Sequence, residues 1–145
     1  DWSSDVCSSD LSDLRENADR MRSLRGRLED GLKQTNGIIV FSQDVERLPN
    51  TTLFTAPGLK AETAVIGFDL AGIAVSSGSA CSSGKVQPSH VLAAMGFHPE
   101  VALGAVRLSL GWSTSEADVD VALKAWLKLS NTLLRGGDET RLERF

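Results

Sequence analysis

The 145-residue chain has few cysteines, no excess of basic charge and no long apolar run, and each shortage excludes a class of protein. Two cysteines, Cys7 and Cys81, are too few for the disulfide framework of a small secreted domain. A formal net charge of −4 provides no basic surface for nucleic acid or for an anionic membrane. Charged residues and glycines interrupt the apolar stretches well short of a membrane span. We therefore expect a cytoplasmic protein that binds neither nucleic acid nor membrane.

Both ends of the chain differ in composition from its middle. Nine of the 13 residues in segment 1–13 are Ser or Asp, and the segment opens with Asp1 and Trp2 rather than with a basic, then apolar, secretory signal. It can bury too little apolar surface to offset its ordering entropy, so we predict a disordered and non-native leader. Residues 135–145 are expected to be a polar tail. The middle, residues 14–134, is long enough for one domain with a buried core.

Helical and strand patterns alternate through this middle part, which favours an α/β or α+β domain. Apolar residues three or four positions apart predict a helix from Leu14 to Leu32, weakened at Gly26 and ended by Gly31 and the Asn36-Gly37 pair. Extended runs predict strands at 38–41, 51–55, 73–75 and 105–110. The remaining patterns predict helices at 61–71, from Pro88 to Met95, and after a capping box of Ser113 and Glu116.

Residues 76–84, Ser-Ser-Gly-Ser-Ala-Cys-Ser-Ser-Gly, contain nothing that can anchor a core. We expect this loop to be exposed and mobile, with Cys81 as an accessible thiol whose thiolate can act as a nucleophile. Lys85 is the nearby cation that would favour the thiolate. The same composition is also typical of a surface loop whose cysteine has no role, since exposure alone does not make a thiol catalytic.

Arg107 is the second candidate, because strand alternation points its side chain away from the face of Val106, Leu108 and Leu110. A guanidinium held on a rigid strand can bind a carboxylate through two parallel hydrogen bonds, although an ordinary solvated arginine has the same spacing. His90 and His98 match no metal-ligand spacing and are assigned no role. Trp112 and Trp126 are expected to pack in the core rather than to form a stacking platform for a ligand.

The stretch AGIAVSSGSACSSGKVQPSHVLAAMG (71–96), followed by AVRLSLGWSTSEADVD (105–120), resembles the C-terminal portion of a cysteine desulfurase, a class V aminotransferase-like enzyme that uses pyridoxal phosphate. The resemblance covers residues 14–134 and implies an α+β fold, the small C-terminal domain of a fold-type I pyridoxal-phosphate enzyme. Three or four short strands would pack against helices, with long helices at both ends. It also implies that Cys81 attacks the sulfur of L-cysteine, and that Arg107 binds the substrate carboxylate.

The products implied by this resemblance are L-alanine and a persulfide on Cys81, whose sulfur passes to an iron–sulfur scaffold protein or another acceptor. Complete members of the family form homodimers and carry a large upstream domain, which binds the cofactor on a lysine that usually follows a histidine. None of the five lysines here, Lys33, Lys60, Lys85, Lys124 and Lys128, follows a histidine. We therefore expect a fragment that holds no cofactor and is inactive alone. A non-catalytic sulfur-relay or docking module, and the same part of a selenocysteine lyase, are the alternatives.

Overall fold

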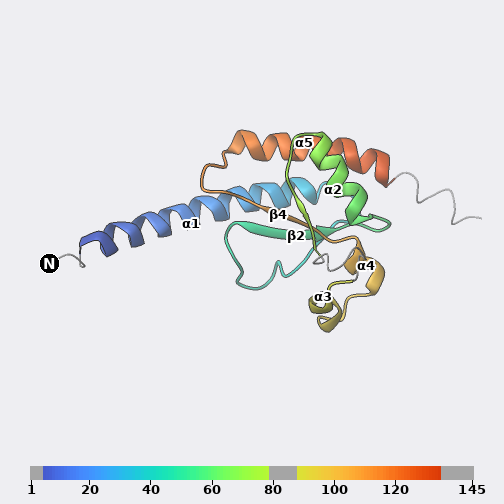
Figure 1. Ribbon diagram of the computed structural model, residues 1–145, viewed down its shortest axis with the longest axis horizontal. Helices are drawn as coiled ribbons and strands as arrows, with labels where there is room; N and C mark the ends of the chain where they lie inside the picture. Colours follow the sequence, from blue (N-terminus) through green and yellow to red (C-terminus); the bar gives the residue numbers. More distant parts are fainter. Residues whose placement is uncertain (1–4, 79–87, 135–145) are drawn as a thin grey trace, which may run out of the picture.

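Four short strands form one antiparallel sheet in the computed structural model, and helices lie against both of its faces (Figure 1). The structure describes residues 5–78 and 88–134, with side chains from residue 14 onward. In chain order the elements are α1 (Asp5–Leu32), β1 (Ile39–Val40), β2 (Thr51–Thr55), α2 (Ala61–Leu70), β3 (Ser76–Ser77), α3 (His90–Ala94), α4 (Pro99–Leu103), β4 (Val106–Ser109) and α5 (Glu116–Leu133). The expected α+β class, with a short sheet and a long helix at each end, is confirmed.

The sheet has the strand order β1-β2-β4-β3, so its two longest strands are central. β2 and β4 pair from Thr51 opposite Ser109 to Phe54 opposite Val106. The two-residue strands β1 and β3 form the edges. Arg107 on β4 is therefore flanked by Leu53 on one side and by Ser76 on the other.

The main core lies between one face of this sheet and the helices α1, α2 and α5 (Figure 1). Trp126 on α5 is 1% exposed at its centre, as the sequence analysis expected. Its ring meets Phe54 edge-on at 5.0 Å and stacks with Phe68 at 6.2 Å. The indole Nε1 donates a hydrogen bond to Thr35 Oγ1 at 3.0 Å, so the one polar atom of this side chain is satisfied.

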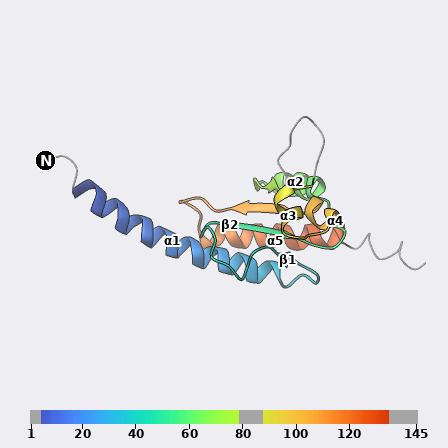
Figure 2. The same cartoon turned by 90° about the horizontal axis from the view of Figure 1, so that it is seen from below.

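The long helices α1 and α5 pack directly on each other along this core. Gly31 makes the close approach possible, because a methyl group there would lie 2.5 Å from Leu123 Cδ1. At the surface, Arg27 of α1 links the two helices, because its Nη2 donates a hydrogen bond to the Asp120 carboxylate of α5 at 2.8 Å. The N-terminal part of α1 extends beyond the sheet and the other helices in both views (Figures 1 and 2).

The opposite face of the sheet is covered in part by the short helices α3 and α4. Leu92 and Ala102 from these helices join Phe41 and Ala105 in a second, smaller apolar cluster. Phe97, between the two helices, meets Phe41 edge-on at 4.8 Å. The part of this face beside Arg107 remains open, and the candidate site lies there.

The structure differs from the predicted elements first at the start of α1 and at the position of the third strand. The prediction of disorder for residues 1–13 is wrong for 5–13, because α1 begins at Asp5 rather than at Leu14. Extending an existing helix costs far less than starting one, because each added residue gains a backbone hydrogen bond. The strand expected at 73–75 instead occupies Ser76–Ser77, where the chain pairs with β4.

The helix starts after residue 87 also differ from their predicted positions. α3 begins at His90, with Ser89 as its N-cap and Pro88 before it, and α4 is a helix that the sequence analysis did not predict. The capping box of α5 consists of Ser115 and Asp118 rather than Ser113 and Glu116. Residues 111–114 form a turn of their own, which moves the first position available for a cap to Ser115.

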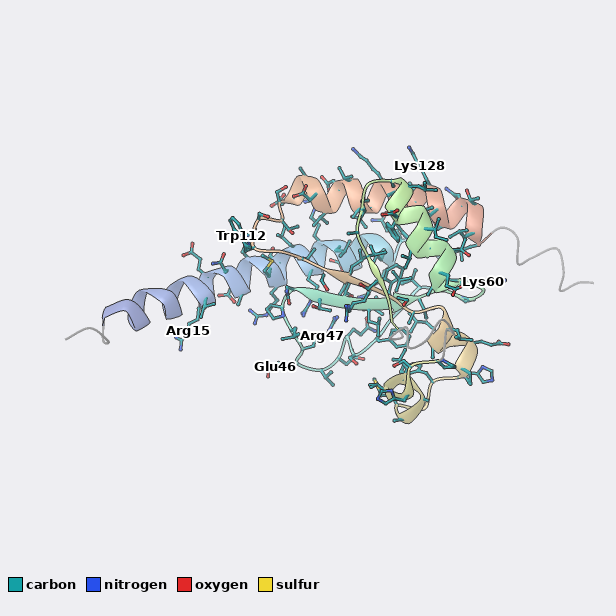
Figure 3. The ribbon with its side chains drawn as sticks, viewed as in Figure 1. Arg15, Glu46, Arg47, Lys60, Trp112 and Lys128 are labelled. Atoms are coloured by element: carbon teal, nitrogen blue, oxygen red, sulfur yellow. The ribbon has the colours of Figure 1, made fainter. Side chains whose placement is uncertain are left out.

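Trp112 is the residue whose environment was predicted least well, since its side chain is 84% exposed rather than packed. It lies in the turn between β4 and α5, beside α1 (Figure 3). Arg20 of α1 holds the backbone of this turn by donating to the carbonyl oxygens of Trp112 and Thr114. The contact with α1 is thus made by the main chain, and the indole faces outward.

Candidate functional site

Arg107 lies on the open face of the sheet, as its place in the alternating strand predicts. The side chains before and after it, Val106 and Leu108, are buried in the main core, whereas Arg107 is exposed. Its guanidinium forms no hydrogen bond or ion pair with any other residue that the structure describes. A rigid central strand therefore presents a charged group whose hydrogen-bond donors are available to a ligand.

The space in front of Arg107 is a hollow of about 380 Å³. Its walls come from the open face of the sheet, from the connection between β1 and β2, from the end of β3 and from α3. The lining residues are Phe41, Ser42, Arg47, Leu48, Thr51, Leu53, Gly78, Ser89, Val91, Leu92, Met95 and Arg107. Among the described residues this lining includes two arginines and no acidic side chain, so the hollow fits a small ligand with an anionic group.

One wall of the hollow depends on an unusual backbone conformation at Ser42. The chain leaves β1 and turns at this residue with φ of 55°, in the left-handed region that a serine rarely adopts. Such a conformation costs on the order of 1–3 kcal/mol and persists only where the surroundings impose it. Here the turn directs the connection 42–49 back over the sheet beside Arg107, where Arg47 and Leu48 complete the wall.

A buried ion pair holds that connection to α1. Arg47 Nη1 and Nη2 donate to the two carboxylate oxygens of Glu29 at 2.7 and 2.8 Å. Arg25, one turn earlier on α1, approaches Glu29 at 3.7 Å and donates to the carbonyl oxygen of Leu48. Burial by itself raises the pKa of Glu29, but the hydrogen bonds from Arg47 and the charges of both arginines hold that pKa below its usual value.

Cys81 lies outside the described residues, but the chain on either side of it is described. On one side, Ser76 and Ser77 pair with β4, and the Gly78 amide donates to the Ala105 carbonyl at 2.6 Å. Gly78 has to be a glycine, since a methyl group there would lie 2.7 Å from Ala105 Cβ. On the other side, Ser89 caps α3. Gly78 and Ser89 both line the Arg107 hollow, so the described residues on both sides of the cysteine segment contribute to this site.

The lysines that the structure describes do not gather at this hollow. Lys33, Lys60, Lys124 and Lys128 are all absent from its lining, and Lys60 and Lys128 lie toward the other end of the domain from Arg47 (Figure 3). A larger hollow of about 610 Å³ contains Lys60, but Glu62 and Glu100 also line it and disfavour a phosphate group there. Within the described part of the chain, neither hollow fits pyridoxal phosphate bound to a lysine.

The two histidines lie at the starts of the short helices. His90 is the first residue of α3, and His98 is the N-cap of α4, where its Nδ1 accepts a hydrogen bond from the Glu100 amide at 3.4 Å. Across residues 5–78 and 88–134 no group of three or more potential metal ligands comes together. No helix in those ranges is both long enough and apolar enough to cross a membrane.

The family model described as aminotransferase class-V matches residues 10–122 of this chain. The chain belongs to the class-V aminotransferase family. Within this family it is similar to curated cysteine desulfurases. An IscS-like cysteine desulfurase of Mycobacterium tuberculosis is 43% identical over 113 residues, covering 77% of this chain and 29% of the relative. Cysteine desulfurase IscS of Clostridium botulinum is 37% identical over 125 residues, covering 82% and 31%. The chain thus spans less than a third of these class-V relatives.

Solved structures of NifS-like proteins share this fold. A NifS-like protein from Rickettsia africae matches with a TM-score of 0.70 and 35% identity, covering 80% of this chain and 29% of that protein. A second NifS-like protein matches with a TM-score of 0.72 and 31% identity, covering 85% and 30%. The domain therefore has the architecture of one portion of a fold-type I pyridoxal-phosphate enzyme, as the sequence resemblance implied.

Proposed function

We propose that this chain supplies the carboxylate-binding arginine, Arg107, and the sulfur-accepting cysteine, Cys81, of a pyridoxal-phosphate-dependent cysteine desulfurase. One observation carries the proposal. The guanidinium of Arg107, which has no partner among the described residues, faces a hollow to which both flanks of the Cys81 segment contribute a lining residue. The similarity to relatives that are named cysteine desulfurases supports the same assignment.

Arg107 is suited to bind the carboxylate of L-cysteine. The fork of its guanidinium matches the two oxygens of a carboxylate, and β4 holds its backbone between two neighbouring strands. The described part of the lining contains no acidic residue that would compete for the guanidinium. Its apolar wall, which includes Val91 and Met95, leaves the remainder of the ligand in a partly dry environment.

The proposed role of Cys81 is compatible with its short separation along the chain from Gly78. Cys81 follows Gly78 by three positions, and a chain of three residues spans at most roughly 11 Å. In the proposed reaction the sulfur of L-cysteine forms a bond with the Cys81 sulfur as its bond to the substrate carbon breaks. A proton takes the place of sulfur on that carbon, and the products are L-alanine and the Cys81 persulfide. No external oxidant or reductant is needed.

We expect residues outside the described ranges to hold the cofactor, because no described lysine lines the Arg107 hollow. We therefore assign this chain no step in cofactor binding and expect it to be inactive by itself. The persulfide would pass its sulfur to an iron–sulfur scaffold protein or to another acceptor. The complete enzyme is proposed to be a cytoplasmic homodimer.

A binding experiment on this chain tests the assignment of Arg107. L-alanine, the proposed product, is titrated into ¹⁵N-labelled protein, and the resonances of the arginine side chains are followed by NMR. One exposed ion pair contributes at most about 1 kcal/mol, so we expect binding weaker than about 1 mM and a titration to high L-alanine concentration. Arg107→Ala should abolish the response, whereas Arg15→Ala, on the protruding part of α1 (Figure 3), should leave it unchanged. If Arg107→Ala binds L-alanine as well as the parent chain does, the proposed carboxylate site is wrong.

A second experiment tests the proposed role of Cys81 and the inactivity of the chain. Sulfide release from L-cysteine is measured with added pyridoxal phosphate and a thiol reductant, beside a Cys81→Ser control. We expect no release from either protein. We also expect that a persulfide donor adds one sulfur atom to Cys81 in a mass spectrum. Release that depends on Cys81 would overturn the claim that the cofactor lysine lies elsewhere, and an unmodified Cys81 would oppose its role as sulfur acceptor.

A further inference from the structure

The two arginines of the hollow differ in how they are paired. Arg107 has no partner among the described residues, whereas both Nη atoms of Arg47 donate to the Glu29 carboxylate at 2.7 and 2.8 Å. Among its described lining residues the hollow therefore contains two guanidinium groups, of which one, Arg107, has both Nη atoms available to a ligand. Glu29 itself is not part of the lining, so it acts on the hollow through Arg47.

The pair between Glu29 and Arg47 is withdrawn from solvent. Relative exposure of the two side chains is 8% for Glu29 and 15% for Arg47. A buried, bidentate pair of this kind exchanges poorly with solutes, because separating it leaves two charges without compensation. A ligand in the hollow thus meets Arg47 with both Nη atoms already donating to the Glu29 carboxylate, which also faces Arg25. It meets Arg107 as a free cation.

We propose that Glu29 is a specificity-determining residue, which keeps Arg47 occupied so that the hollow selects ligands with one carboxylate over ligands with two. This inference rests on the proposed role of Arg107 as the carboxylate-binding residue. The substrate class would then be amino acids with an uncharged side chain, of which L-cysteine is an example. Glu29 is a positioning residue here, since it does not touch the ligand.

The physical basis is the number of free guanidinium groups within one small cavity. A dicarboxylate has to desolvate two negative charges, and one free arginine compensates only the first of them. Replacing Glu29 by Gln keeps the shape of the side chain but leaves a single oxygen acceptor and no charge. Arg47 would then recover a donor edge and a net positive charge at the wall of the hollow.

The experiment compares L-alanine with L-aspartate, titrated separately into the full chain and followed by NMR. We expect the parent chain to bind L-aspartate no more tightly than L-alanine. In Glu29→Gln, affinity for L-aspartate should rise about tenfold relative to L-alanine, and the double variant Glu29→Gln with Arg47→Gln should return the ratio to the parent value. Glu46→Gln removes the same charge one residue from Arg47, at an exposed position, and should leave the ratio unchanged (Figure 3).

Two results would overturn the proposal. One is a folded Glu29→Gln variant with the parent ratio of the two affinities, because Glu29 would then serve the fold alone. The other comes from Arg47→Gln, which serves as the test if Glu29→Gln does not fold. In Arg47→Gln the Glu29 carboxylate still has Arg25 as a cationic partner. If Arg47→Gln weakens L-aspartate binding relative to L-alanine, Arg47 already binds the second carboxylate. Failure of the proposed function has a separate signature, namely unchanged L-alanine binding in Arg107→Ala.

Discussion

The same substitution, Gly→Ala, should change stability in opposite directions at two positions of this fold. Gly26 lies inside α1, and a methyl group added there would meet no atom within 4 Å. Gly104 caps the C-terminal end of α4, just before β4. A methyl group at Gly104 would lie 2.5 Å from the Leu59 carbonyl oxygen and 2.7 Å from Thr55 Oγ1.

The expected magnitudes follow from these surroundings. Gly26→Ala should raise the free energy of unfolding by about 0.5–1 kcal/mol, because alanine loses less backbone entropy than glycine in a helix. Gly104→Ala should lower it by about 1–3 kcal/mol, since the obstructing Leu59 oxygen belongs to the backbone and moves only with its segment. The two variants should therefore differ by roughly 1.5–4 kcal/mol.

The comparison requires urea unfolding of the parent and both variants, followed by far-ultraviolet circular dichroism. The dependence of the free energy on urea concentration should be the same for all three, so that midpoints report stability directly. If Gly104→Ala is as stable as Gly26→Ala, the close approach at Gly104 does not constrain the chain. In that case the placement of β4, and of Arg107 upon it, must be fixed by other contacts.

Two further predictions concern buried polar groups. Thr35→Val should lower the free energy of unfolding by about 1–3 kcal/mol, because the Trp126 Nε1 donor loses its acceptor. The control Thr63→Val, at an exposed position, should change stability little, and equal losses of the two variants in urea unfolding would contradict this reasoning. Folding lowers the pKa of Glu29, so its stabilising contribution is present above the unfolded value of about 4.3 and is lost as pH falls through the folded pKa. Glu29→Gln should thus lose less stability than the parent as the pH falls from about 5 to about 2, and an identical loss in the two proteins would contradict this reasoning.

The orientation of Arg107 and the burial of Trp126 could be predicted because each follows from a local period. A strand alternates its faces with period two, so burial of Val106 and Leu108 fixes the direction of Arg107. The apolar stripe of α5 likewise places Trp126 toward the core. These features depend on nothing beyond a few neighbouring residues.

The ion pair of Glu29 and Arg47 could not be predicted in this way. Its partners are 18 positions apart, and they meet only because the turn at Ser42 returns the chain to α1. The exposure of Trp112 is likewise decided by a contact between Arg20 and a turn more than 90 residues away. α4 is a single short helix of five residues, too brief for a recognisable period.

The packing of α1 against α5 has a consequence for how the protein is made. Leu24 and Leu28 on α1 are buried in the same core as Val119 and Trp126 on α5, a helix that the ribosome completes about one hundred residues later. At a synthesis rate of roughly 5–20 residues per second, that interval is on the order of 5–20 s. Non-local pairing of this kind also slows folding itself. During synthesis the apolar face of α1 thus stays uncovered for seconds, which makes this helix a natural target for chaperones during translation.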